Sequence, residues 1–135
     1  MDKTHDTEDR KTVRRFDVNK KRLQMVIKVL EKVPVKRFYL WSWFDKSYGE
    51  CGSTACAIGW CAQDKRFVEE GLTLQRGEPI YECFYGWDAV EEFFELTERQ
   101  ASRLFNESGY KDLAHDPKPK DVIKKIRHFI KTGEC

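Results

Sequence analysis

The stretch between residues 53 and 63 is rich in small side chains, and this feature limits how the whole chain can fold. Its small members are Ala55, Ala57, Gly59 and Ala62. Ser53 or Thr54 can cap a helix here, because hydroxyl side chains accept hydrogen bonds from the free amides at a helix start. Such a thin helix lets another backbone approach closely but buries little area of its own. We therefore expect a central helix that is buried over more than half of its circumference.

Because the thin helix buries little area itself, neighbouring segments must supply its contacts. The aromatic-rich segment directly before it is the nearest source of them. Residues 38–48 hold six aromatic side chains, which are Phe38, Tyr39, Trp41, Trp43, Phe44 and Tyr48. The rings are too dense to follow one period, so we expect an extended or irregular segment.

Apolar side chains three and four positions apart predict amphipathic helices on either side of this region. The first starts at Asp17 or Asn19 and ends before Pro34, because a proline disfavours helical geometry in the residue before it. Its apolar stripe consists of Leu23, Val26, Ile27, Leu30 and Val33.

Three later helices have recognisable starts near Trp87, Thr97 and Pro119. Thr97 and Gln100 form a capping-box pattern, and a proline is favoured in the first turn of a helix. Gly133 lies where a glycine usually ends the last helix. On the helix at 87–96 we expect the apolar side chains inward and the acids outward, namely Glu91, Glu92 and Glu95.

A β-hairpin is predicted between the central helix and these later helices. Residues 72–75 and 80–85 alternate as strands do, and residues 76–79 have the composition of a turn. Because a lone hairpin is marginal in water, it must lean on the helices.

These elements fit one domain. The chain has 135 residues, of which 40% are apolar, so it can fill a single core. Residues 1–12 show no period, and we expect a flexible charged tail followed by one globular domain at 13–133. The predicted fold class is mainly α (α+β), with about five helices packed around the central small-residue helix and one short β-hairpin.

The charge balance limits the function classes. Lys and Arg number 25 against 23 Asp and Glu, and the net charge of +2 excludes a strongly electrostatic polyanion binder of the histone kind. No apolar run reaches the roughly 18–20 residues of a membrane-spanning helix, and no apolar signal segment follows Met1. We therefore expect a cytoplasmic protein without membrane contact, in which the five cysteines stay thiols.

Two motifs resemble a known group of proteins. Residues 51–60 read C-G-S-T-A-C-A-I-G-W, and residues 96–105 read L-T-E-R-Q-A-S-R-L-F. Both are similar to small uncharacterised bacterial and phage proteins that share a C-G-[ST]-x-x-C-x-x-G-W core and an L-[ST]-x-x-Q-A-x-x-L-F helix. The resemblance runs over residues 18–132 and implies a common fold and a phage or mobile-element setting. It carries no activity over to this chain.

Packing explains the first motif without any chemistry. Its structural members are Cys51, Gly52, Ser53, Cys56, Gly59 and Trp60. The glycines allow a sharp turn and a slim helix, and a buried free cysteine behaves as a small hydrophobe. Cys56 and Cys61 lie five residues apart, which is about 140° around a helix, so they cannot face one ion. We expect no metal and no cofactor.

A cysteine-dependent amidase or deamidase is one alternative. Cys51 or Cys56 at a helix N-terminus would have its thiolate favoured by the helix dipole. His115 is then the candidate base, with Asp116 or Asp121 as its orienting group.

Our primary interpretation is a non-catalytic protein that binds a host protein or protein complex, such as a defence or nuclease component. Aromatic side chains are the usual anchors of interfaces. The candidate anchors are Trp41, Trp43, Tyr48, Tyr81 and Tyr85. Residues 69–98 contain nine acids and one base, Arg76, and this stretch would suit a basic partner.

Nucleic-acid binding is a second alternative. The first and last predicted helices are both basic, and they would form one patch if they were adjacent. Lys120, Lys124, Lys125 and Arg127 are the candidates on the last helix.

Overall fold

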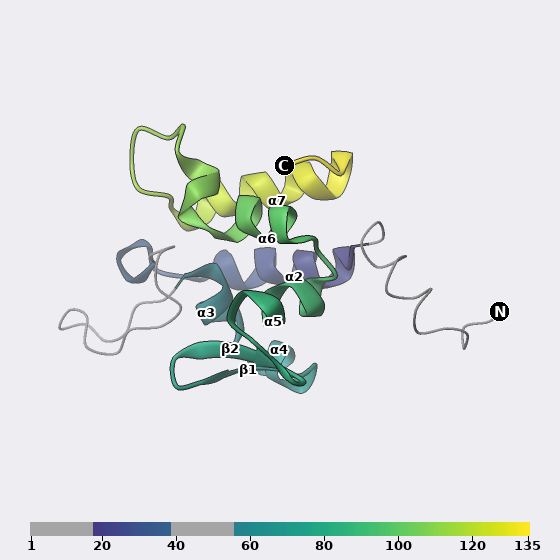
Figure 1. The fold of residues 1–135 in the computed structure, drawn as a ribbon. Helices are drawn as coiled ribbons and strands as arrows, with labels where there is room; N and C mark the ends of the chain where they lie inside the picture. Colours follow the sequence, from purple (N-terminus) through teal and green to yellow (C-terminus); the bar gives the residue numbers. More distant parts are fainter. Residues whose placement is uncertain (1–17, 39–55) are drawn as a thin grey trace.

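The computed structural model describes residues 18–38 and 56–135, and within these ranges the fold is mainly α with one small antiparallel sheet (Figure 1). This confirms the predicted fold class. The helices are α2 (Lys20–Leu30), α3 (Ala57–Cys61), α4 (Lys65–Glu69), α5 (Gly86–Phe94), α6 (Glu98–Phe105) and α7 (Pro119–Thr132). The strands are β1 (Leu72–Gln75), β2 (Glu78–Tyr81) and β3 (Phe84–Tyr85). Single 3-10 turns occupy Val35–Arg37 and Glu107–Tyr110.

Helix α2 runs through the middle of the molecule, between α7 on one side and α3 and α5 on the other (Figure 1). Asn19 caps it, because its side-chain oxygen accepts a hydrogen bond from the amide of Arg22 at 3.0 Å. The predicted stripe is buried except for its last member, Val33, which packs partly exposed against the core. The helix ends at Leu30, four residues before the proline.

Helix α3 is buried as expected, but it is shorter than the predicted helix. It begins after Cys56, whose backbone is extended and whose Sγ accepts a hydrogen bond from the amide of Gly59 at 3.4 Å. It ends at Cys61, and Asp64 then caps the separate helix α4, which the sequence pattern did not reveal. Only one side chain of α4, Phe67, is buried, so its apolar period is too short to recognise.

The predicted hairpin contains a second turn, which makes it a three-stranded sheet. The first turn is only Arg76–Gly77, and both residues have positive φ, as the commonest two-residue hairpin turn requires. Pro79 therefore lies within β2. Strand β3 pairs with β2 only at Ile80 and Tyr81, so no residue of β3 stands opposite the proline. The missing N–H of Pro79 therefore removes no hydrogen bond between the strands. A further turn at residues 82–83 separates β2 from β3.

The later helices begin and end close to their predicted signals. The capping box of Thr97 and Gln100 is present, and Gly133 ends α7 with a φ of 79°. The acids of this region, Glu91, Glu92 and Glu95, are only partly exposed, and Phe93 joins the predicted inward residues in the core. The inward rings of Phe67, Phe93, Phe94 and Phe105 form a continuous aromatic cluster.

Candidate protein-binding surface

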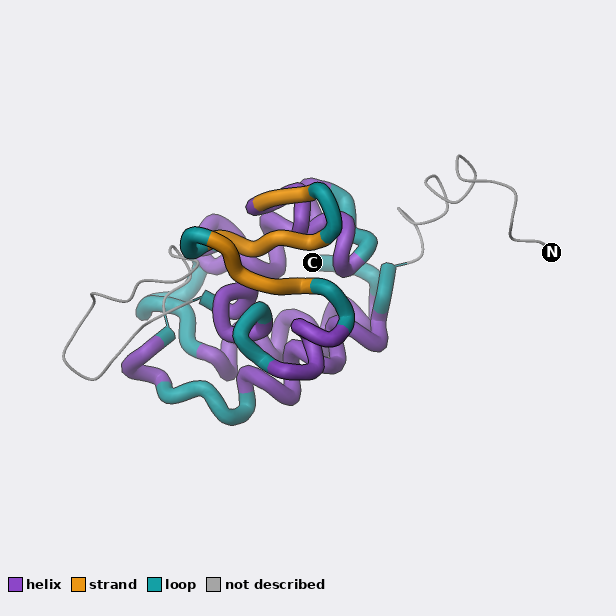
Figure 2. The backbone as a smooth tube through the Cα atoms, turned by 90° about the horizontal axis from the view of Figure 1, so that it is seen from below, coloured by secondary structure: helices purple, strands orange, loops and turns teal. Residues whose placement is uncertain are grey.

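The sheet has one face against the helices and one face toward solvent. Side chains of directly paired residues share a face, and successive residues alternate between faces. The inward face carries two pairs, Leu72 with Tyr81 and Leu74 with Pro79. Leu72 and Pro79 are buried. The opposite face consists of Thr73, Gln75, Glu78, Ile80 and Tyr85, and we call it the outer sheet surface. Figure 2 shows the three strands lying in front of the helices.

Tyr85 is the most exposed aromatic side chain among the described residues, at 55%. It stands directly across from Ile80, which is half-buried, so an aromatic ring and a branched aliphatic side chain form a cross-strand pair on the outer sheet surface. Strand β3 leads straight into α5, and this connection fixes the position of Tyr85 at the helix start.

Exposed acidic side chains lie before and after this part of the chain. Glu78, Glu82 and Asp88 are all exposed. A side-chain oxygen of Glu78 lies 3.2 Å from where a Cβ on Gly86 would stand, which places the carboxylate beside the first residue of α5. The positive end of the helix dipole favours a carboxylate there. Within residues 69–98 the only basic side chain is Arg76, at the tip of the first turn.

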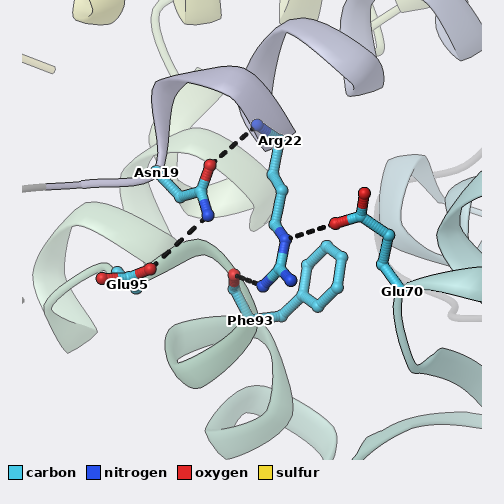
Figure 3. Close-up of polar contacts among 5 residues, drawn as sticks. All are labelled: Asn19, Arg22, Glu70, Phe93 and Glu95. Carbon is cyan, nitrogen blue, oxygen red and sulfur yellow. Dashed lines mark hydrogen bonds and ion pairs between the residues drawn. The ribbon is translucent and has the colours of Figure 1, made fainter.

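A polar cluster beneath the sheet holds it to the central helix (Figure 3). The guanidinium of Arg22 donates to a carboxylate oxygen of Glu70 at 2.9 Å and to the carbonyl oxygen of Phe93 at 2.8 Å. Its Cζ lies 4.0 Å from the ring centroid of Phe93 and 5.7 Å from that of Tyr81. The two rings meet edge to face at 5.1 Å. Arg22 therefore joins α2, the end of α4, β2 and α5.

The predicted anchor residues are thus divided. Tyr85 lies on the outer sheet surface, whereas Tyr81 points inward and packs against the core. Trp41, Trp43 and Tyr48 lie outside the described residues. Ile80 was not singled out in the sequence, and the signal that could have found it is its alternation with Tyr81.

Cys56 lies in an environment typical of a structural cysteine. Its side chain is 1% exposed, and burial raises the pKa of its thiol to about 11. The hydrogen bond from the Gly59 amide lowers this pKa, but by less than burial raises it. Burial also raises the pKa of Cys61 well above its ordinary value. Cys51, Gly52 and Ser53 lie outside the described residues.

Trp60, the last residue of the motif, is half-buried. Its indole N–H donates to the carbonyl oxygen of Arg37 at 3.1 Å, which ties α3 to the turn after α2. The ring lines an open groove of about 350 Å³ together with Val33 and Gln63.

His115 lies on the exposed connection before α7, where its Nε2 is 3.1 Å from Oδ2 of Asp121. The same carboxylate oxygen accepts the amide hydrogen of Lys118 at 2.8 Å, so Asp121 also caps α7. Asp121 therefore lies where the orienting group was predicted, and Asp116 is exposed. The contacts of the described residues include no hydrogen bond between His115 and Cys56.

The basic helices are adjacent, as the nucleic-acid alternative required. Helices α2 and α7 pack side by side, and Arg127 forms an ion pair with Glu31 at 3.4 Å. Lys120 and Lys124 are exposed, whereas Lys125 packs over the ring of Tyr110 and bonds to the carbonyl oxygen of Gly109.

Comparisons with protein-family models, with curated proteins and with solved structures found no match to this chain. Among the residues that the structure describes, no group of three His, Cys, Asp or Glu side chains could hold a metal ion. None of the described helices is long and apolar enough to cross a membrane.

Proposed function

We propose that this protein acts as a non-catalytic binding protein, and that its outer sheet surface docks on a basic surface of a partner protein. The observation that carries the proposal is the exposed Tyr85 paired across the strands with half-buried Ile80, on a sheet face that also carries the acid Glu78. Tyrosine is enriched at the energetic centres of interfaces, where it fills a pocket on the partner.

The charges around the pair support a basic partner. Glu78 lies on the same face of the sheet as Tyr85, and Glu82 and Asp88 lie three residues before and after it in the chain. These acids would meet Lys or Arg side chains at the rim of the interface. Such complementarity speeds association and excludes acidic partners. The resemblance of the two motifs to bacterial and phage proteins supports a partner from a bacterial host.

A photo-crosslinking amino acid placed at residue 85 in the full chain tests the proposal. The matched control carries it at Val35, which is also 55% exposed but lies on the turn after α2. We expect position 85 to crosslink to one bacterial protein through a Lys- or Arg-rich peptide, and we expect Glu78→Lys to weaken the crosslink. Equal crosslinking at both positions, or a yield unaffected by Glu78→Lys, would contradict the proposal.

A further inference from the structure

A basic stripe on α7 faces away from the core. Lys120, Lys124, Arg127 and Lys131 follow one another at spacings of four, three and four residues, and all four are exposed. Residues at these spacings lie on one face of a helix. The stripe is about 16 Å long, since a helix rises about 1.5 Å per residue.

Few acidic side chains of the described residues form ion pairs with the stripe. In the part of the chain that the structure describes, Lys120, Lys124 and Lys131 form no ion pair. Only Arg127 is paired, with Glu31 of α2. Beside the stripe, a shallow groove of about 300 Å³ between α2 and α7 is lined by Glu31, Lys120, Ile123, Lys124 and Arg127. Lys28 of α2 is exposed one turn before Glu31 and adds a further positive charge near this groove.

The acids of the sheet, Glu78 and Glu82, lie at the other end of the molecule. Figure 1 shows α7 and the sheet at opposite ends, with α2 and α5 between them. The basic stripe and the acids of the sheet are therefore separated in space, although the net charge of the chain is only +2. An anionic ligand on α7 does not meet the acids of the outer sheet surface.

We propose that the stripe Lys120–Lys124–Arg127–Lys131 binds the phosphate backbone of a nucleic-acid duplex without reading its sequence. The length of the stripe matches about five nucleotides of one strand at 3.4 Å each. Single strands are bound by aromatic side chains that stack on the bases, and the only aromatic side chain of α7 besides His128 is Phe129, which is buried.

The same geometry argues against a membrane or an acidic protein as the ligand. A helix that lies on a membrane inserts its apolar face, but the apolar face of α7 is buried against α2 and α6. A protein interface needs an apolar centre, and Ile123 in the groove is buried.

A fluorescein-labelled 20-base-pair DNA duplex tests the proposal by anisotropy with the full chain. Counterion release predicts that the logarithm of the binding constant falls with the logarithm of salt concentration, with a slope of about −3.6 for four phosphate contacts. Lys124→Ala should weaken binding about 8-fold at 0.1 M salt and reduce the slope by about 0.9. Lys124→Arg should bind within twofold of the wild type, since it keeps the charge.

Two controls separate this site from others. Lys65→Ala removes an exposed lysine of α4, and Tyr85→Ala removes the anchor of the outer sheet surface; both should bind the duplex as the wild type does. The absence of binding at 50 mM salt would overturn the proposal. So would an unchanged affinity of Lys124→Ala, a loss caused only by Arg14→Ala and Arg15→Ala, or tighter binding to phosphatidylserine vesicles than to the duplex.

Discussion

Replacing Arg22 with alanine should destabilise the protein far more than replacing the neighbouring lysine. The guanidinium makes three contacts beneath the sheet, with a carboxylate of Glu70, with the carbonyl of Phe93 and with the ring of Phe93. Its side chain is only 18% exposed, so solvent cannot replace these contacts once the side chain is removed. Arg22→Ala also leaves the carbonyl oxygen without this donor.

The size of the effect follows from the contacts. The ion pair is worth about 1 kcal/mol, since Glu70 is one-third exposed and water screens it. The charged hydrogen bond to the carbonyl contributes about 1.5 kcal/mol. The cation–π contact with the ring contributes about 0.5–1 kcal/mol. The total of about 3 kcal/mol is a large part of the roughly 5–15 kcal/mol that stabilises a domain.

Urea unfolding followed by circular dichroism measures this free energy. Arg22→Ala should lower the free energy of unfolding by about 3 kcal/mol, and Arg22→Lys by about half as much, because an ammonium keeps the charge but cannot make the forked contacts. Lys21→Ala is the matched control: Lys21 is exposed on the same helix, and its loss should cost no more than about 0.5 kcal/mol. Equal costs for Arg22→Ala and Lys21→Ala would refute the reasoning.

Three further predictions concern the cysteine motif, the first hairpin turn and the cap of α7. With a pKa of about 11, only about one Cys56 thiol in a thousand is ionised at pH 8. Iodoacetamide should therefore label the exposed Cys83 and spare the buried Cys56 in the folded protein. Tandem mass spectrometry of the labelled peptides measures this difference. The neutral buried thiol stabilises the fold below pH 9, and this contribution should disappear as the pH rises to 11. Arg76→Asn should stabilise the protein by about 0.5–1 kcal/mol in thermal unfolding, because Asn tolerates the positive φ better; a lower melting temperature would contradict this. Burial works to raise the pKa of Asp121, but the hydrogen bond from the Lys118 amide and the hydrogen bond and charge of His115 together outweigh it and hold that pKa below its usual value. The stability lost in Asp121→Asn should therefore be largest above pH 4 and vanish as the pH falls through the lowered pKa.

Local signals in the sequence predicted the later helices well. Thr97 and Gln100 are three residues apart and satisfy each other's backbone amides, so the start of α6 depends on neighbours in the chain. The end of α7 at Gly133 is equally local, because only glycine adopts a left-handed backbone without strain.

The faces of the sheet could not be predicted in this way. A single strand over 80–85 would place Tyr81 and Tyr85 on the same face, since they are four residues apart. The turn at residues 82–83 contains no glycine, asparagine or proline, which are the residues typical of turns. Glu82 adopts a positive φ of 58°, which is unusual for a glutamate and could not be predicted from its residue type. The turn moves Tyr85 to the solvent face, and the sequence pattern contains no sign of it.

Contacts between distant segments were also beyond the sequence. Its charge alone would place Arg22 on the exposed face of its helix, but Glu70 and Phe93, 48 and 71 residues away, supply the partners that let it lie half-buried. The start of α3 at Cys56 was missed for a related reason, because a thiol is a weaker acceptor than the hydroxyls before it and is seldom chosen as a cap.

The affinity of the crosslinked partner for Tyr85→Ala is the most direct test of the outer sheet surface as a binding site. If Tyr85 fills a pocket at the centre of the interface, its truncation should weaken binding at least tenfold in isothermal titration calorimetry, which corresponds to about 1.4 kcal/mol. Val35→Ala, at an equally exposed apolar residue, should stay within twofold of the wild type. Equal affinities for the wild type and Tyr85→Ala would contradict the account.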